Sequence, residues 1–452
     1  MKQLPNQFEQ NLKKQLGDEF PRFVAALDEP PPVSIRFNKR KLKNPELKTQ
    51  NPPVPWHTEG VYLSARPSFT LDPAFHAGAY YVQEASSMFI AEALRQLVDF
   101  QQDLKAIDLC AAPGGKSSLL ASLLSEDSFL IANEVIKSRV EILKENIVKW
   151  GHPSVCVANH DVEDFIELEN YFDIVLVDAP CSGEGLFRKD PKAIDEWSLD
   201  AVQTCSSRQK RILAAAEKVL SPDGILMYST CTYNDFENRE NVEWLLQKFD
   251  LEQVKLTINP DWVIDEKPYG YQFYPHRVRG EGFFLSIFKK KNKGKTPLSI
   301  PKLKFEKLPK KQVDMAAKWL KQPDKFDFFI KPNGVVFVIL KKQIERYALI
   351  DKVLKRKSVG LEIGEFKGND FVPSHDLALS IEVAETTPSV HLSKIEALRF
   401  LKKESFDVDF EAAPKGWALV RYEGLALGWV KILPNRINNY LPKDYRIRMD
   451  IY

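Results

Sequence analysis

This chain of 452 residues has few cysteines and no long apolar run. Its five cysteines are odd in number and widely spaced, and no CxxC pair occurs. That distribution disfavours a disulfide framework and a structural zinc site, so we expect no metal and a reducing, cytoplasmic location. No apolar run reaches 18 residues, which disfavours a membrane span, and the N-terminal MKQLPNQFEQ lacks the apolar core of a signal peptide.

An excess of charge of one sign is also missing, because the formal net charge is only +2. Bulk charge therefore does not indicate a nucleic-acid partner. Local charge is different, since the segment from Lys289 to Lys311 holds ten lysines and a single acid, Glu306. Such a segment is either a solvated linker or a patch that contacts RNA, and the sequence leaves both interpretations open.

The central part of the chain alternates between strand-like and helix-like segments. The strand-like segments are KAIDLC, SFLIANEV, VCVANHD, FDIVLVDAP and GILMYSTC. Helical spacing occurs between them, so we expect an α/β fold with an open, Rossmann-like parallel sheet and helices on both faces. GFFLSIFKK is predicted to be the last strand, at an antiparallel edge.

The length is too great for a single core, and proline- and lysine-rich stretches suggest four units. We predict an N-terminal α+β module over 1–95, the sheet domain over 96–290, and a linker with a mixed α/β module over 291–385. A β-rich domain over 386–452 follows, with strands at FDVDF, GWALVRY and LALGWVKI. The pattern assigns no role to residues 312–385.

A strand, a glycine turn and a helix follow each other in AIDLCAAPGGKSSLLASLL, and this arrangement lets backbone N–H groups approach a polar ligand. A phosphate-binding P-loop would need glycine where Cys110 stands, and a dinucleotide fingerprint would need more than the pair Gly114-Gly115. The candidate cofactor-binding residues of this turn are Cys110, Ala111, Ala112, Pro113, Gly114, Gly115 and Lys116.

Three acids end successive predicted strands. Glu134 follows Gly114 by twenty residues, where a carboxylate can accept both hydrogen bonds of a ribose diol. Asp161 is placed to accept from an adenine amino group, and Asp178 faces the same crevice. Each acid alone is as well explained as a helix cap or a surface charge, but three at one sheet edge favour a ligand. The predicted ligand therefore has a ribose, but the sequence lacks a loop that would bind a pyrophosphate. S-adenosylmethionine fits this description.

Two further strands end in a small polar tip that holds one thiol each, Cys181 and Cys231. Ligands gather at the carboxyl ends of parallel strands, so both thiols are predicted to face one crevice. Thiols beside a cofactor pocket suggest nucleophilic chemistry. Cys156 and Cys205 are instead interpreted as small buried hydrophobes, and Cys110 as structural.

The motifs DLCAAPGGKS, VDAPCSGEG and YSTCTYNDFEN together resemble the Nop/Sun family of RNA cytosine-5 methyltransferases. The resemblance covers about residues 30 to 290 and includes Arg36, Asn38, Gln83 and Glu84. The C-terminal segment GWALVRYEGLALGWVKILPNRINNYLPKDYRIR is similar to the PUA-like domain of the bacterial RsmF type, which methylates 16S ribosomal RNA.

The resemblance implies the chemistry and its residues. Cys231 corresponds to the nucleophile that adds to carbon 6 of cytosine, and Cys181 to the cysteine that helps release the product. Asp178 is predicted to contact the base near N3. Cys110 to Lys116, Glu134, Asp161 and Asp178 correspond to the S-adenosylmethionine contacts. The implied partner is structured RNA, ribosomal RNA or a ribosomal subunit, and nothing requires more than a monomer.

Other functions stay open at this point. The same chemistry on transfer RNA or 23S ribosomal RNA is one, and a non-catalytic RNA-binding assembly factor is another. A DNA cytosine-5 methyltransferase would use Cys181 as nucleophile, but the Thr-Cys pair at Cys231 disfavours it. A nicotinamide-dependent oxidoreductase is disfavoured by the missing third glycine.

Overall fold

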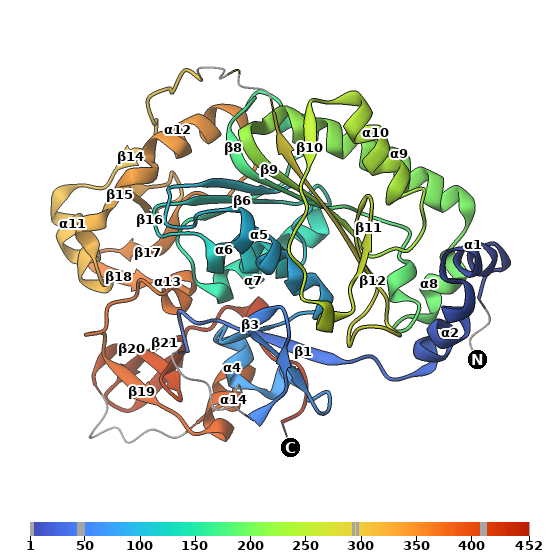
Figure 1. Cartoon of the computed structure of the whole chain (residues 1–452). Coiled ribbons are helices and arrows are strands. Elements are labelled where there is room, and N and C mark those ends of the chain that lie inside the picture. The colour runs from blue at the N-terminus through green and yellow to red at the C-terminus, as the bar shows by residue number, and fades with distance from the viewer. Residues whose placement is uncertain (1–3, 43–49, 292–293, 295–297, 407–413, 452) are drawn as a thin grey trace.

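The computed structural model of the protein describes residues 4–42, 50–291, 294, 298–406 and 414–451. Within these residues the chain forms four β-sheets with helices around them, and the largest sheet runs through the middle of the molecule (Figure 1). No helix in this part of the chain is both long and apolar enough to cross a membrane.

The central sheet has nine strands in the order β11-β12-β13-β9-β8-β5-β6-β7, with β10 paired to β13. Its strands are β5 (Lys105–Asp108), β6 (Phe129–Asn133), β7 (Val155–Ala158), β8 (Phe172–Asp178), β9 (Leu220–Thr230), β10 (Leu251–Gln253), β11 (Asp265–Lys267), β12 (Gly270–Phe273) and β13 (Phe283–Lys290). The strands β5 to β9 pair in parallel, and the strand order reverses between β5 and β8. Ligands bind at such a switch point in open α/β sheets, which places the crevice at the carboxyl ends of β5 and β8.

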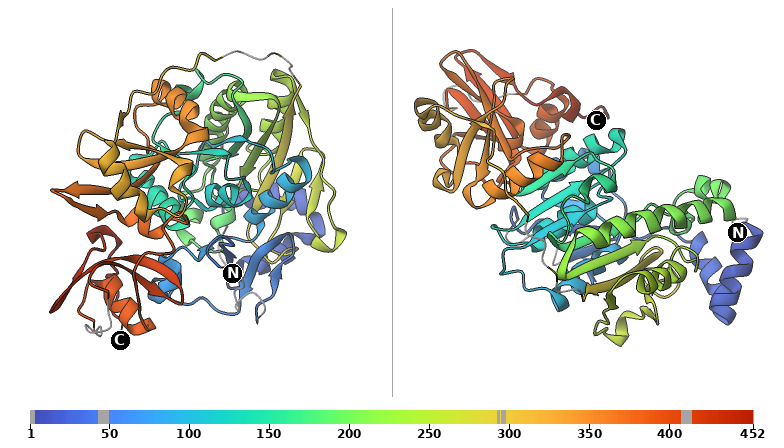
Figure 2. Two further views of the ribbon diagram at one scale, coloured as in Figure 1. Left: turned by 90° about the vertical axis from the view of Figure 1, so that its left-hand side faces the viewer. Right: turned by 90° about the horizontal axis from the view of Figure 1, so that it is seen from above.

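Helices cover both faces of this sheet, as the alternating pattern predicts. One face packs against α5 (Phe89–Leu97), α6 (Gly115–Leu123) and α7 (Lys137–Trp150), and the other against α9 (Leu199–Val219) and α10 (Arg239–Lys248). A shorter helix, α8 (Pro191–Glu196), precedes α9, and Figure 2 shows the long α9 beside the sheet. The expected α/β fold is confirmed.

The strand β13 corrects one prediction. It is antiparallel to β9, as expected, but it does not form the edge of the sheet. The strands β12 and β10 also pair with β13, because residues 251–273 contribute strands that the sequence pattern did not predict.

The first two lysines of the lysine-rich segment belong to β13 and do not form a solvated linker. Lys290 is only 4% exposed, and its Nζ lies 2.9 Å from Oε1 of Glu217. The same Nζ donates to the carbonyl oxygens of Glu217 and Leu220. Lys289 is half-exposed and pairs with the exposed carboxylate of Asp223 at 3.1 Å. Lys290 therefore stabilises the core and is not available to RNA.

We predict that Lys290→Ala lowers the free energy of unfolding by about 3 kcal/mol, because it removes the buried ammonium and leaves the partly buried Glu217 carboxylate unpaired. Lys289→Ala is the matched control and should cost less than about 1 kcal/mol, since its ion pair is exposed to solvent. Urea unfolding followed by tryptophan fluorescence measures both values. Equal losses in the two variants would contradict the buried ion pair.

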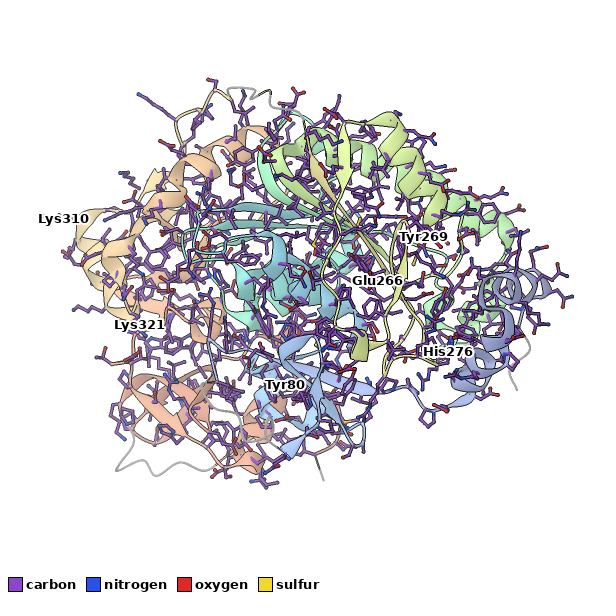
Figure 3. The ribbon with its side chains drawn as sticks, viewed as in Figure 1. Tyr80, Glu266, Tyr269, His276, Lys310 and Lys321 are labelled. Carbon is purple, nitrogen blue, oxygen red and sulfur yellow. The ribbon has the colours of Figure 1, made fainter. Side chains whose placement is uncertain are left out.

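The N-terminal module contains α1 (Asn6–Leu16), α2 (Phe20–Asp28) and α4 (Pro73–His76). Its antiparallel sheet has the order β2 (Pro53–Val54), β3 (His57–Leu63), β1 (Val33–Phe37), β4 (Tyr80–Val82). A bidentate hydrogen bond from Arg277 to Glu19, which precedes α2, ties the helices to the loop after β12. His276 lies 2.8 Å from the same carboxylate, and Figure 3 shows it beside α2. Hydrogen bonds from Arg277 and then His276 lower the pKa of Glu19 to about 2.

The region that the sequence left unassigned forms a five-stranded antiparallel sheet. Its strands are β14 (Glu306–Lys307), β15 (Phe326–Ile330), β16 (Val335–Leu340), β17 (Leu361–Lys367) and β18 (Asp370–Pro373), with helices α11 (Lys310–Ala316), α12 (Ile344–Val353) and α13 (His375–Leu379). Tyr347 and Ile350 of α12 pack into the core on the α9 face of the central sheet. This sheet is thus joined to the central domain by a continuous apolar contact.

The C-terminal sheet has the order β19 (Ser389–His391), β20 (Gly416–Tyr422), β21 (Leu425–Leu433), β22 (Arg436–Asn439), with α14 (Lys394–Lys402) beside it. The strands β20 and β21 match two of the predicted strands, whereas residues 407–410 of FDVDF lie outside the described residues. The C-terminal and N-terminal sheets share one apolar core, in which Phe37 and Tyr80 join Phe400 and Val430. Figure 3 shows Tyr80 where the two sheets meet.

Candidate active site

The glycine turn between β5 and α6 borders a cavity of about 160 Å³. The walls of this cavity come from residues 81–84, Ser87, 110–113, Gly115, Lys116 and Asp178. Gly114 adopts φ +112°, a conformation that favours glycine, immediately before the first turn of α6. A Cβ on Gly115 would stand 3.2 Å from the Tyr81 ring, so glycine keeps this part of the cavity open.

Asp108, at the end of β5, is a buried acid that the sequence reasoning did not single out. It accepts a hydrogen bond of 2.6 Å from the Ser117 hydroxyl and one of 3.4 Å from the backbone N–H of Cys110. Burial raises its pKa to about 7. The carboxyl group therefore holds the turn to the start of α6. Its position one residue before the LCAAPGG run was the signal available in the sequence.

Glu134 lies directly after β6 and is 3% exposed. One carboxylate oxygen accepts from the N–H of Ile136 at 2.9 Å, and the other lies 3.1 Å from Arg139. Arg139 in turn donates to the carbonyl of Ala112 at 2.7 Å. The structure thus places Glu134 behind the glycine turn, although Glu134 is not among the residues that line the cavity.

Asp161 stands further from the cavity than the sequence pattern suggested. Both of its oxygens accept hydrogen bonds from Arg211, at 2.7 and 3.0 Å, and one also accepts from the N–H of Glu163. The hydrogen bonds from Arg211 lower the pKa of Asp161. The structure does not bring Asp161 to the cavity wall, and its carboxylate is engaged in a half-exposed ion pair.

Asp178 ends β8 and faces the cavity together with Lys116. The Lys116 ammonium lies 2.6 Å from one carboxylate oxygen, and the Ser229 hydroxyl donates to the other at 2.9 Å. Burial alone would lower the pKa of Lys116, but the charge and hydrogen bond of Asp178 raise it above its usual value. Lys116, a candidate residue of the glycine turn, thus lines the cavity beside Asp178.

The two candidate thiols meet. Asp178 of β8 is in register with Ser229 of β9, so the chain segments after the two strands run side by side. The sulfur atoms of Cys181 and Cys231 are 2.8 Å apart, and the backbone N–H of Cys231 points to the Cys181 sulfur at 3.4 Å. The hydrogen bond with Cys231, together with burial, raises the pKa of Cys181 well above its usual value. Cys181 is therefore held in its thiol form at neutral pH, and either sulfur can donate the hydrogen bond between them.

Two buried acids hold the cysteine loops in place, and the sequence reasoning missed both. Glu184 is 1% exposed and accepts from the backbone N–H groups of Tyr233 and Asn234 at 2.8 and 3.1 Å. Glu237 is fully buried and accepts from the N–H of Ser182 at 3.0 Å. Each acid reaches from one cysteine loop to the other, so the pair fixes the separation of the two thiols.

The N-terminal module also reaches the cofactor turn. The guanidinium of Arg36 is fully buried, stacks 4.4 Å above the Trp150 ring, and donates to Gln83 at 2.8 Å and to the Gly115 carbonyl at 3.2 Å. Burial lowers its pKa to about 9. Gln83 and Glu84 line the cavity itself, so the module positions one of its walls.

Cys156, Cys205 and His160 have structural surroundings. Cys156 is buried, and Cys205 is half-buried on α9. One ring nitrogen of His160 lies 2.8 Å from Asp164, and the other accepts the backbone N–H of Arg356, which connects it to the five-stranded sheet. Among the described residues, no group of three or more His, Cys, Asp and Glu side chains is arranged to hold a metal ion.

Three family models match this chain in sequence order. Residues 4–85 match the N-terminal domain of 16S rRNA methyltransferase RsmF, residues 95–289 match 16S rRNA methyltransferase RsmB/F, and residues 387–447 match the RsmF PUA domain. The three matches cover the N-terminal sheet, the central sheet and the C-terminal sheet respectively.

Known proteins resemble the chain over most of its length. Ribosomal RNA small subunit methyltransferase F of Shewanella sp. (strain W3-18-1) is 30% identical, over 97% of this chain and 96% of the relative. The protein of the same name from Aeromonas salmonicida (strain A449) is 31% identical over 93% of this chain and 92% of its own. A solved structure of a methyltransferase homolog protein from Pyrococcus horikoshii has a TM-score of 0.54 and 30% identity, covering 62% of this chain and 93% of that one.

Proposed function

The chain belongs to the 16S rRNA methyltransferase RsmB/F family, and from this membership we propose that it methylates carbon 5 of a cytidine in 16S ribosomal RNA. It is an RNA methyltransferase that uses S-adenosylmethionine. The observation that carries the finer proposal is the pair of cysteine sulfurs 2.8 Å apart beside the cavity at the switch point.

The residues around the glycine turn fit S-adenosylmethionine. Glycine at 114 and 115 leaves the backbone accessible at the start of α6, and the acids Asp108, Glu134 and Asp178 surround the turn. We propose that Cys110 to Lys116, Glu134 and Asp178 hold the cofactor, with Glu134 at the ribose and Asp161 at the adenine. Asp161 would have to exchange its Arg211 ion pair for that contact. When bound, S-adenosylmethionine supplies an electrophilic methyl group.

This assignment predicts unequal effects on cofactor affinity. Glu134→Gln keeps the size of the side chain but removes the charge, so its affinity should fall about tenfold or more, the value of a charged hydrogen bond. Asp161→Asn should cost less, because Arg211 already competes for the carboxylate. Calorimetric titration measures both, with Glu163→Gln, another partner of Arg211, as the control. Unchanged affinity in Glu134→Gln would show that Glu134 does not contact the cofactor.

The proposed chemistry needs a thiolate because carbon 5 of cytosine is a weak nucleophile. The Cys231 sulfur adds to carbon 6, and the electrons of the double bond between carbons 5 and 6 move toward N3 and O2. Carbon 5 would then form its bond to the methyl group of bound S-adenosylmethionine as the bond between that methyl group and the sulfonium sulfur breaks, which would leave S-adenosylhomocysteine. A base removes the proton from carbon 5, the double bond re-forms, and the bond between sulfur and carbon 6 breaks, which returns the electron pair to Cys231. Covalent catalysis of this kind divides one difficult step into easier ones.

The surroundings of Cys231 support these steps. The thiol of Cys181 lies 2.8 Å from the Cys231 sulfur, so it is placed to hydrogen-bond that sulfur as it leaves carbon 6. We propose that Asp178 hydrogen-bonds the base near N3, through a proton supplied by the acid or shared with the ring. Lys116, already bound to Asp178, fixes the orientation of that carboxyl group.

The outer modules are proposed to hold the RNA. Residues 1–95 and 386–452 are taken as RNA-binding units, 96–290 as the catalytic domain, and 291–385 as a structural connector. The shared core of the N-terminal and C-terminal sheets supports this division, because it keeps the two modules in one orientation relative to each other. Trp429 of the C-terminal sheet is 1% exposed and donates to the Ser374 carbonyl, so it serves packing and not base stacking.

A further inference from the structure

A second, larger cavity lies next to the one at the cofactor turn. It has a volume of about 660 Å³ and is walled by residues 29–34, 63–66 and 82–84 together with Arg188, Lys189 and Arg279. We call it the arginine cleft. Residues 82–84 line both cavities, so the cleft opens beside the cofactor turn.

The arginine cleft is lined by four cations, Arg66, Arg188, Lys189 and Arg279, and by two acids, Glu29 and Glu84. Among its acids, Glu84 is turned away, since its carboxylate accepts from the backbone N–H groups of Ser86, Ser87 and Glu281, each at 2.9 Å. Arg188 has a structural role, because its guanidinium donates to the carbonyl of Pro30 at 2.9 Å. Arg188 therefore holds the wall of the cleft together, and the other cations of the lining are Arg66, Lys189 and Arg279.

Arg66 and Arg279 are the cations best placed to meet a ligand. Both are exposed, and each guanidinium lies over an aromatic ring, Phe69 at 5.4 Å and Tyr62 at 4.4 Å. Within the part of the chain that the structure describes, no carboxylate forms an ion pair with either residue. A guanidinium supported by a ring keeps a fixed plane, which suits bidentate contact with phosphate oxygens.

The arginine cleft also reaches the cysteine pair. Arg279 is followed by a short turn to Gly282, and a Cβ on Gly185 would lie 2.9 Å from the Gly282 carbonyl and 2.4 Å from that of Cys231. Gly185 itself donates its N–H to the Cys231 carbonyl at 2.6 Å. The loop that carries Arg279 is thus packed against the loop that carries the proposed nucleophile.

We propose that the arginine cleft binds the single-stranded RNA segment next to the target cytidine, with Arg66 and Arg279 on its phosphodiester groups. The inference rests on the proposed function, which brings a nucleotide to Cys231. A base must leave its stack to reach such a site, so its neighbours are held as single strand. Arg66 also lines a further hollow of about 570 Å³, together with Phe69, Phe75 and Tyr81. The proposed RNA strand would continue from the cleft into this hollow.

The experiment measures how RNA affinity depends on salt. The probe is a fluorescein-labelled single-stranded RNA of mixed sequence, about 15 nucleotides long, and the readout is anisotropy at several salt concentrations. The variant Arg66→Gln/Arg279→Gln should weaken binding about tenfold and lower the slope of log K against log salt by about 1.4, since each phosphate contact on a single strand contributes about 0.7.

The matched control is Lys318→Gln/Lys321→Gln, which removes the same charge from the region of the five-stranded sheet. Pro275, which precedes His276, lines the cleft. Figure 3 shows Lys321 on the opposite side of the molecule from His276. The control should keep the wild-type slope. A wild-type slope in the arginine variant would overturn the proposal. If the wild type neither bound nor methylated any RNA, the proposed function would fail instead, so the two failures are distinguishable.

Discussion

Cys181→Ala is expected to leave RNA covalently attached to the enzyme. The Cys181 thiol lies 2.8 Å from the Cys231 sulfur, and removing it takes away the group placed to hydrogen-bond this sulfur as it leaves carbon 6. The loss of one hydrogen bond to a charged group is worth about 2 kcal/mol, or about 30-fold in the rate of release. Adduct should therefore accumulate. Expression in cells, a denaturing gel and a probe for attached RNA measure it, and sequencing of the trapped RNA identifies the substrate.

The double variant Cys181→Ala/Cys231→Ala is the control for this trap, because it lacks both thiols. It should hold no RNA on the denaturing gel. If Cys231→Ala alone traps RNA and Cys181→Ala does not, the roles of the two cysteines are reversed, as in the DNA cytosine-5 mechanism. If neither single variant traps RNA, the covalent mechanism loses its main support.

Cys231→Ala should abolish methyl transfer. Without the sulfur there is no addition to carbon 6, and removal of a catalytic nucleophile lowers kcat by about 10⁴-fold or more. Transfer of a radioactive methyl group to small-subunit RNA measures the loss. Affinity for the cofactor should stay unchanged, because Cys231 is assigned to the cytosine and not to the cofactor.

Cys231→Ser separates the chemistry from the packing at this position. Serine keeps a hydrogen-bonding group of similar size next to Cys181, but a hydroxyl is a far weaker nucleophile than a thiolate. Its activity should be as low as that of the alanine variant. Substantial activity in either variant would show that Cys231 is not the nucleophile.

Several parts of the fold and the candidate site follow from local sequence. The apolar runs before Asp108, Asp178 and Cys231 predict buried parallel strands, because such strands are covered on both faces. The glycine pair after Cys110 predicts a tight turn before a helix. These features depend on residues within about one turn or one strand, so the sequence shows them directly.

Other parts depend on partners far along the chain. Asp161 has the position of a ligand in the pattern, but Arg211, fifty residues later, occupies its carboxylate. Lys290 looks like linker charge, yet it is buried because Glu217 and the end of α9 lie beside β13. No local pattern predicts the Asp161–Arg211 pair or the Lys290–Glu217 pair, since each depends on how the strands and helices pack.

The α/β class, the glycine turn and the position of Cys181 and Cys231 at strand ends can all be predicted from local sequence. The contact between these two sulfurs cannot, because it depends on the register of β8 with β9. Glu184 and Glu237 hold that contact from opposite loops, and the arginine cleft combines three distant parts of the chain. The residue at which a strand ends depends on its neighbours in the sequence. The distances between side chains of a site depend instead on long-range packing, which local sequence does not predict.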